Sequence, residues 1–280
     1  SDENTRAYLE AQGRGEAYRE LRADEGASYD EHAEIDLSSL EPLIACPSSP
    51  GNVVPVREVA GIKADQVIIG SSVNSSFRDL MVVAKIMEGR HRHPDTSLHI
   101  NPGSNQVLEN VAHQGGLGLL LRAGARIHQS GCLGCIGMGQ APGTGQVSLR
   151  TFPRNFPGRS GTKDDRVYLC SPETGAAAAL KGVITDPRDL GKESRYPRIT
   201  DPKKYLVDKE SILSPSGGLR KTEVVRGPNI KPLPKMDPLP DTLEGDVVIK
   251  VGDNISTDTI MPAGNKVLPL RSNIEAISEF

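Results

Sequence analysis

Short apolar runs of strand character alternate with stretches of helical spacing between Val53 and Lys181. Val67–Ile69 is one such run. Gly70–Ser72 ends it, and apolar residues then recur at helical spacing across Phe77–Ile86. An order of strand, loop and helix along the chain is typical of α/β domains with a mainly parallel sheet. The sequence therefore predicts an α/β fold.

The same alternation continues through the rest of this segment. Further strands are expected at Leu98–Ile100, Ala125–His128, Val147–Phe152 and Val167–Leu169, and further helices over Val107–Val111 and Thr174–Lys181. The loops after the strands are rich in glycine and polar residues: Gly70–Ser76, Asn101–Asn105, Gln129–Gln140 and Pro153–Gly161. In open α/β sheets such loops gather at the carboxyl edge of the strands, where ligands bind. We therefore expect the functional site at that edge.

Composition excludes several classes of protein. The 280 residues carry 33 basic and 36 acidic side chains, with six Tyr, four Phe and no Trp. This balance disfavours a basic nucleic-acid surface and an aromatic stacking platform. No apolar stretch is long enough for a transmembrane helix, and the polar N-terminus lacks a signal-peptide core. Four cysteines favour a reducing cytoplasm, with metal or redox use of a cysteine pair, over a disulfide scaffold.

The two ends of the chain differ in character from the α/β segment. The N-terminal part is polar, with weak helical periodicity around Tyr8–Leu21, and near the other end Asp246–Val251 alternates like a strand. The chain starts without Met and stops soon after this strand pattern, so we expect a piece of a longer protein. The expected divisions are a polar extension (1–45), the α/β domain (46–190), a Pro-rich linker (191–245) and the start of another domain (246–280).

Two cysteines separated by two residues are the sharpest local feature. Thiolates at Cys132 and Cys135 can bind one metal centre, and the flanking glycines let backbone N–H groups approach the sulfur atoms. The spacing alone leaves zinc, an iron–sulfur cluster and redox chemistry open. It also fits two small residues buried in a tight turn. His128 precedes this loop and could support groups beside a metal.

Three further segments carry polar chemistry. Gly70–Ser76 places hydroxyls and the Asn74 amide at a helix N-terminus, which suits an anion, a polar ligand or an ordinary helix cap. Arg154 and Arg159 flank a turn, where each could clamp a carboxylate or remain solvated. Asp253–Asp258 combines Asp, Asn and Ser as in loops with side-chain hydrogen bonds.

Taken in order, these four segments resemble the aconitase superfamily of iron–sulfur dehydratases. The family patterns G-S-C-T-N-S-S, C-x-x-C-I-G, R-N-F-x-G-R and D-N-x-S-T-D correspond to Gly70–Ser76, Cys132–Gly137, Arg154–Arg159 and Asp253–Asp258. The resemblance covers about residues 30–280 and is greatest to short single-chain aconitate hydratases. It implies an aconitase-like three-layer domain with a mainly parallel sheet, then a linker and the start of a swivel domain.

The resemblance implies a [4Fe–4S] cluster with three protein ligands and one open iron, which acts as a Lewis acid on the substrate. Cys132 and Cys135 match two ligands, and Ser72 stands where the family has its first cysteine. Three alternatives are open for the third ligand. Another cysteine substitutes, in which case loop residue Cys46 is favoured over Cys170 on its strand. Alternatively Ser72 ligates as an alkoxide, or the cluster is absent or labile.

The resemblance also implies roles in substrate binding and catalysis. The small tricarboxylic acid substrate, citrate or isocitrate, would be bound by Arg154, Arg159, Arg271, Asn74 and Ser75, and Asp258 would be catalytic. The implied reaction is that of an aconitate hydratase, citrate to isocitrate through cis-aconitate. The alternatives are a 3-isopropylmalate or homoaconitate isomerase and an inert fragment that lacks its N-terminal and swivel domains. An RNA-binding regulator is disfavoured by the acidic charge.

Overall fold

The computed structural model describes residues 1–191, 196–210, 223–253, 255, 257, 261 and 267–280. The chain divides into two compact units, Ser1–Ser211 and Ile212–Phe280. No helix within the described ranges combines the length and the apolar character that a membrane crossing requires.

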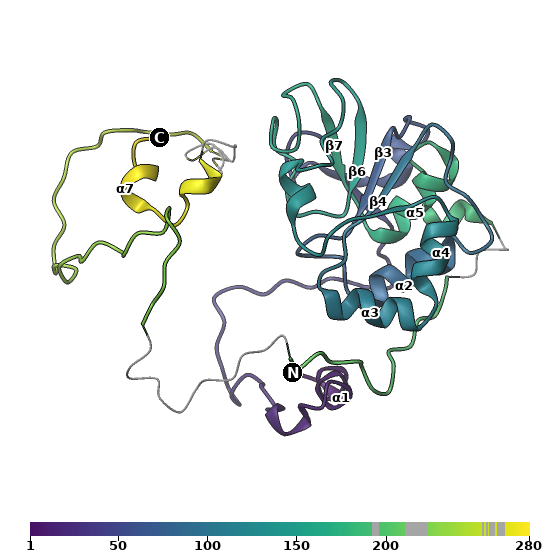
Figure 1. Ribbon diagram of the computed structural model, residues 1–280, viewed down its shortest axis with the longest axis horizontal. Coiled ribbons are helices and arrows are strands. Elements are labelled where there is room, and N and C mark those ends of the chain that lie inside the picture. Colours follow the sequence, from purple (N-terminus) through teal and green to yellow (C-terminus); the bar gives the residue numbers. More distant parts are fainter. Residues whose placement is uncertain (192–195, 211–222, 254, 256, 258–260, 262–266) are drawn as a thin grey trace. The chain divides into compact units, whose positions relative to one another are not determined.

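The first unit is built on a seven-stranded mixed sheet (Figure 1). Its strands are β1 (Leu43–Ala45), β2 (Val53–Pro55), β3 (Gln66–Ile69), β4 (Ser97–Ile100), β5 (Arg126–Ile127), β6 (Val147–Arg150) and β7 (Arg166–Leu169). They lie in the order β2-β1-β7-β6-β3-β4-β5. Strands β7 to β5 in this order pair in parallel, and β1 is antiparallel to both of its neighbours. The predicted α/β class with a mainly parallel sheet is confirmed.

One face of the sheet packs against helices (Figure 1). These are α2 (Phe77–Ile86), α3 (Asn105–His113), α4 (Gly116–Arg122) and α5 (Pro172–Lys181), of which α4 was not predicted. Their buried residues form one apolar cluster with Val67 and Ile69 of β3. Helix α5 lies close to the sheet, because a Cβ at Gly175 would be 2.6 Å from the Ile69 side chain. Small residues in α5 therefore permit this approach. The short 3-10 helices of this unit are η1 (Gly15–Ala17), η2 (Val56–Val59), η3 (Leu133–Ile136) and η4 (Pro187–Leu190).

The opposite face of the sheet is covered by two loops. Ile68 of β3 points to this side, where it packs with Cys135 and Phe152. These partners belong to the segments 128–146 and 151–165, which follow β5 and β6. The third layer of the expected three-layer domain thus consists of loops and one short 3-10 helix in the described part of the chain.

The expected N-terminal extension contributes to the first unit. Helix α1 (Glu3–Ala11) lies earlier than the helical pattern at Tyr8–Leu21. The Asp2 side chain caps it by accepting from the Thr5 N–H at 2.9 Å, and Gly13 follows it at φ +68°. Strand β1 also lies within residues 1–45 and pairs with β7. The sheet therefore begins before residue 46.

Part of the expected linker packs on the same unit. Tyr205 is buried, with its ring edge-to-face to Tyr8 and Phe77 at 5.6 and 5.8 Å between centroids. Its N–H donates to the Ala11 carbonyl at 2.9 Å. By contrast, the Pro-rich residues 223–253 are exposed. The linker expected over 191–245 stays a prediction, and Tyr205 within it packs on the first unit.

The second unit contains two short elements among its described residues. These are η6 (Leu268–Leu270) and α7 (Ile274–Ile277). Asn273 caps α7 by accepting from the Ala276 N–H at 3.2 Å. The strand predicted over Asp246–Val251 is wrong, because this stretch is exposed and irregular. The described residues provide no neighbouring strand, and an unpaired strand leaves its backbone groups without partners.

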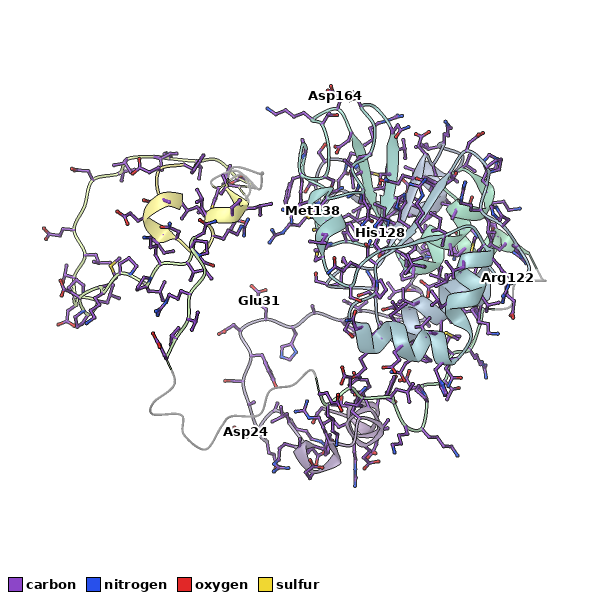
Figure 2. All side chains as sticks on the ribbon, viewed as in Figure 1. Asp24, Glu31, Arg122, His128, Met138 and Asp164 are labelled. Atoms are coloured by element: carbon purple, nitrogen blue, oxygen red, sulfur yellow. The ribbon has the colours of Figure 1, made fainter. Side chains whose placement is uncertain are left out.

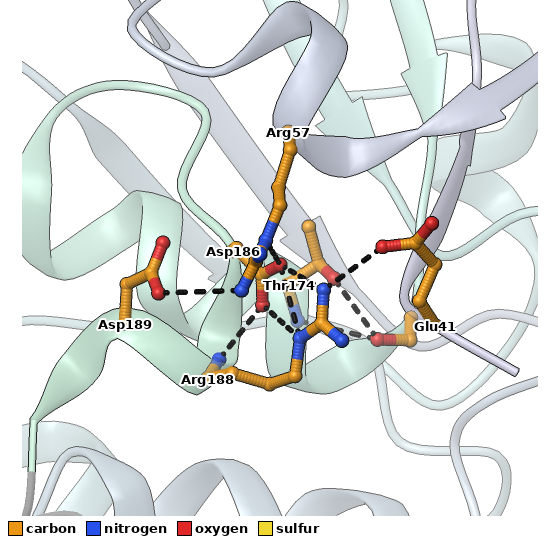
Figure 3. A network of polar contacts seen from close by, with 7 residues as sticks. Glu41, Arg57, Thr174, Asp186, Arg188 and Asp189 are labelled. Atoms are coloured by element: carbon orange, nitrogen blue, oxygen red, sulfur yellow. Dashed lines mark hydrogen bonds and ion pairs between the residues drawn. The ribbon is translucent and has the colours of Figure 1, made fainter. Parts of the chain in front are cut away.

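A buried carboxylate joins distant segments of the first unit (Figure 3). Asp186 accepts hydrogen bonds from Arg188 Nη2 at 2.7 Å and from Arg57 Nε at 2.9 Å. Arg188 also donates to Glu41 at 3.0 Å, and Arg57 lies 3.7 Å from Asp189. The hydrogen bonds from Arg188 hold the pKa of Asp186 well below its usual range, and Arg57 lowers it further. The network therefore ties η4 to η2 and to the segment before β1.

We expect Asp186→Asn to lower the free energy of unfolding by about 2 kcal/mol at pH 7, since an amide cannot balance two guanidinium groups. The folded-state pKa of Asp186 is lowered. Its contribution is therefore complete above the unfolded-state pKa of about 4 and is lost as pH falls below that value. Urea titrations at several pH values should show that the difference in free energy of unfolding between the wild type and Asp186→Asn shrinks in acid. Asp189→Asn is the matched control, and a difference that stays constant into acid would contradict this account.

Candidate functional site

Loops from three strands meet at the carboxyl edge of the sheet. The Gly70 N–H, after β3, donates to Thr151 Oγ1, after β6, at 2.8 Å. Asn74 Nδ2 donates to the Thr151 carbonyl at 3.1 Å. The Gly103 N–H, after β4, donates to the Ser75 carbonyl at 3.3 Å. The expected gathering of these loops at one edge is present in the structure.

The hydroxyls of the Gly70–Ser76 loop have different roles. The buried Ser75 Oγ donates to the Ser71 carbonyl at 2.7 Å. Ser76 forms a capping box with Asp79 at the start of α2, as the helix-cap interpretation expected. Ser72 is exposed, with its Oγ 3.9 Å from the Sγ of Cys132. Ser72 is therefore the hydroxyl that faces the cysteine loop.

The two cysteines lie at and beside η3, one exposed and one buried. Cys132 is exposed, whereas Cys135 is 3% exposed and its thiol interacts with that of Cys132. Arg159 Nη2 donates to Cys135 Sγ at 3.2 Å. The structure thus brings together two thiols, the Ser72 hydroxyl and one guanidinium group. No set of three His, Cys, Asp or Glu side chains within the described ranges is arranged to hold a metal ion.

The electrostatics at Cys135 oppose deprotonation in the metal-free chain. Burial raises the pKa of Cys135 above its ordinary value, the neighbouring Cys132 raises it further, and Arg159 acts in the opposite direction. A metal ion removes this obstacle, since coordination deprotonates a thiol outright. Two thiols and one hydroxyl are therefore the groups gathered here that could hold a metal centre.

The cysteine loop is packed tightly against the following loop. Gly137 has φ +76°, and a Cβ there would lie 1.9 Å from the Ser160 carbonyl oxygen. Ser160 Oγ in turn donates to the Cys135 carbonyl at 3.2 Å. Figure 2 labels Met138 and His128, which lie on either side of Cys135 in the chain. Only glycine at position 137 allows the two loops to approach this closely.

His128 pairs with another histidine. Its Nε2 lies 2.8 Å from His99 Nδ1, and the rings stack with centroids 5.0 Å apart. Burial lowers the pKa of His99 to about 4, and the positive neighbours His128 and Arg126 add to this effect. Burial and then Arg126 also lower the pKa of His128. Burial thus disfavours the charged form of both rings, and the N–H of one ring donates a hydrogen bond to the ring nitrogen of the other.

Cys46 and Cys170 lie with the apolar cluster on the helix side of the sheet. Burial and then Glu58 raise the pKa of Cys46. Burial, with a smaller effect of Glu173, raises the pKa of Cys170 to about 12. Cys46, which the sequence favours over Cys170 as a substitute ligand, thus packs with the helix-side cluster, whereas Cys135 packs with Ile68 and Phe152. The geometry brings Ser72 to the cysteine pair instead.

The two arginines of the candidate site share one loop after β6. Arg154 is half-buried, and between it and Arg159 the buried Asn155 anchors the backbone. Asn155 Nδ2 donates to the Cys46 carbonyl at 2.9 Å and to the Val167 carbonyl at 3.0 Å. This anchor fixes the path of the loop that carries Arg159 to Cys135.

Two expected site residues belong to the second unit. Arg271 follows η6 and is exposed. Asp258 lies outside the described residues. The substrate-binding role of Arg271 and the catalytic role of Asp258 therefore stay predictions.

The sequence patterns missed one buried cation at this site. Arg150 of β6 is fully buried and donates to Ser148 Oγ, the Gly134 carbonyl, Gln66 Oε1 and the Gln140 carbonyl. The available signal was a charged residue inside a strand whose neighbours are mostly apolar. A cation in such a strand needs acceptors from elsewhere in the chain.

Comparisons with known proteins identify the family to which the chain is similar. A model of the Aconitase family (aconitate hydratase) matches residues 1–63 and 57–182. The 3-isopropylmalate dehydratase large subunit of Elusimicrobium minutum is 41% identical over 193 residues, which is 69% of this chain and 46% of that protein. A 3-isopropylmalate dehydratase large subunit of Thermotoga maritima is 42% identical over 67% of this chain and 46% of its own length. The homoaconitase large subunit of Thermus thermophilus is 43% identical over 62% of this chain and 42% of its own length. The chain spans less than half the length of these curated relatives.

We expect Gly137→Ala to lower the free energy of unfolding by about 3 kcal/mol, because it combines positive φ with a clash against the Ser160 backbone. Gly139→Ala is the matched control, with φ +69° and nothing within 4 Å of the added Cβ. Gly139→Ala should lower the free energy of unfolding by only about 1 kcal/mol. Chemical denaturation of both variants measures the difference. Equal decreases in the free energy of unfolding of the two variants would show that the two loops are not in close contact at Gly137.

Proposed function

Because the chain belongs to the aconitase family, we propose that it supplies the cluster-binding part of an iron–sulfur hydro-lyase that acts on a small hydroxy acid with several carboxylates. The observation that carries this proposal is the hydrogen bond of Arg159 to Cys135, at 3.2 Å. It places a group suited to carboxylate recognition directly beside the thiol pair.

The proposed cofactor is a [4Fe–4S] cluster held by Cys132, Cys135 and Ser72. The contact between Ser72 and Cys132 and the interaction between the two thiols support this choice. When bound, such a cluster supplies a Lewis-acidic iron that polarises a substrate hydroxyl. Ser72 would serve as an oxygen ligand, which is stabilised as the alkoxide only by the metal. Cys46 is not proposed as a ligand, because it packs with the helix-side core.

The remaining groups at the sheet edge would bind and orient the substrate. Arg154 and Arg159 extend from one loop, and each guanidinium can engage a carboxylate through two parallel hydrogen bonds. Asn74 donates to the Thr151 carbonyl of the loop after β6, and Ser75 donates to the Ser71 carbonyl of its own loop. We therefore assign these two residues to shaping the substrate site. The exposed side of Cys132 and Ser72 leaves this site open to a small molecule.

The relatives favour the second of the expected reactions. Those reported above are named as 3-isopropylmalate dehydratase or homoaconitase large subunits, whereas the first expectation was an aconitate hydratase. We therefore propose a substrate of the 3-isopropylmalate class for the whole enzyme. Because these relatives are named as large subunits and this chain matches less than half of each, further chain segments and a smaller subunit would complete the site.

Anaerobic reconstitution with iron and sulfide tests the cofactor. The wild-type chain should bind about four irons and show thiolate charge-transfer absorption. Cys132→Ala and Cys135→Ala should each abolish this absorption, and Ser72→Ala should lose iron at least about tenfold faster to a chelator. Cys46→Ala is the matched control and should behave as the wild type. Loss of iron in Cys46→Ala with retention in Ser72→Ala would overturn the proposed ligand set.

Titration calorimetry with the reconstituted chain tests the substrate class. We expect 3-isopropylmalate to bind more tightly than citrate. Arg159→Lys should weaken binding about tenfold, because an ammonium group cannot form two parallel hydrogen bonds to a carboxylate. Arg166→Lys, at the start of β7, controls for a general effect of replacing an arginine by a lysine. Equal binding by the Arg159 variant and the wild type would remove the substrate role of this side chain.

A further inference from the structure

We propose that Arg150 is a positioning residue for the cysteine loop: its buried guanidinium holds both ends of Gly134–Gln140 and so fixes Cys135 for cluster binding. This inference rests on the proposed iron–sulfur function. It concerns a fully buried side chain of β6.

The two ends of the loop are held by opposite nitrogens of one guanidinium group. Arg150 Nη1 donates to the Gly134 carbonyl at 2.7 Å, and Nη2 donates to the Gln140 carbonyl at 2.8 Å. Gly134 directly precedes Cys135, and Gln140 ends the turn that follows it. Because the guanidinium fork is planar and rigid, it sets the separation of these carbonyls. An ammonium group in the same place could not span them.

The guanidinium is itself oriented by two neighbouring strands. Arg150 Nε donates to Ser148 Oγ at 2.9 Å, and Nη2 donates to Gln66 Oε1 at 3.1 Å. Ser148 Oγ donates to the same Gln66 oxygen at 2.7 Å. Ser148 and Gln66 are register partners in β6 and β3. The rigid sheet therefore determines where the guanidinium points, and the guanidinium determines where the loop lies.

The same network reaches the loop that carries Ser72. Gln140 and Asn101 exchange two side-chain hydrogen bonds, at 2.8 and 2.9 Å, and both residues are buried. The carbonyl of Asn101 packs against Gly70, where a Cβ would lie only 2.1 Å away. Two residues after Gly70, the chain presents Ser72 to Cys132. One buried cation therefore supports both loops that carry the proposed ligands.

The charge of Arg150 is also complementary to the proposed cofactor. All four of its hydrogen-bond acceptors in the described chain are neutral. Burial lowers the pKa of Arg150 to about 10, while Asp165 and Cys135 act in the opposite direction. A buried cation without a hydrogen-bonded anion is costly, and a cluster ligated by thiolates supplies negative charge nearby.

The test compares Arg150→Lys and Arg150→Met with a control, Arg166→Met. Arg166 is an exposed strand arginine that donates to a different loop carbonyl, that of Gly145, at 3.3 Å. Three measurements are made on the 280-residue chain: thermal midpoint, iron per chain after reconstitution, and the alkylation rate of Cys135 in the metal-free protein by mass spectrometry. The alkylation rate reports on the loop without requiring activity or metal.

We expect both Arg150 variants to alkylate Cys135 at least about tenfold faster and to lose iron at least about tenfold faster, with Arg166→Met unchanged. Arg150→Lys keeps the charge, so its failure to restore the wild-type rates would identify geometry as the cause. If Arg150→Met unfolds, the proposal is tested with Arg150→Lys alone, in which residues 134–140 should exchange their amide hydrogens faster than in the wild type. Wild-type alkylation and iron retention in Arg150→Lys would overturn the proposal. If the wild-type chain binds no iron, the proposed function fails, and the alkylation rates still test the positioning of the loop.

Discussion

A positive charge buried on the face of a β-sheet has to find hydrogen-bond acceptors, and this requirement organises the candidate site. Arg150 finds one of them on its own strand, one on the neighbouring strand β3 and two in the cysteine loop. The loop folds over the sheet because its carbonyls satisfy the guanidinium. Cys135 then lies against Ile68 and Phe152, within reach of Arg159. Arg150 thus contacts the loop that carries Cys135, and Arg159 contacts Cys135 itself.

Much of the fold could be predicted because each element carries a local signal. The apolar run at Val67–Ile69, the capping residue Ser76 and the Ser171-Pro172 start of α5 each specify structure within a few residues. The false strand at Asp246–Val251 shows the limit of such signals. Alternation of apolar and polar residues predicts that a strand has one face to bury, but it does not identify the neighbouring strand. Strand pairing depends on residues far away in sequence.

The candidate site could be predicted only where its chemistry is also local. The cysteine spacing and the paired arginines stand within single loops, and the structure brings Arg159 to Cys135. The sequence left Cys46 and Ser72 open as the third ligand, because the choice depends on which face of the sheet a side chain occupies. The role of Arg150 was hidden for the same reason. Ser148 and Arg150 alternate with Val147 and Leu149 as though facing solvent, yet loops from elsewhere in the chain cover them.

The two faces of the sheet differ in what holds them together. The helix side is an apolar cluster to which α2 to α5 and Ala11 of α1 contribute, whereas the loop side is held mainly by hydrogen bonds around a few buried polar groups. Layers held in these different ways can open separately, since local unfolding follows the contacts that a segment would lose. The cysteine loop can therefore lift from the sheet while the helix side stays folded. Such an opening would expose Cys135, together with Ile68 and Phe152 against which it packs, while the helix-side core stays buried.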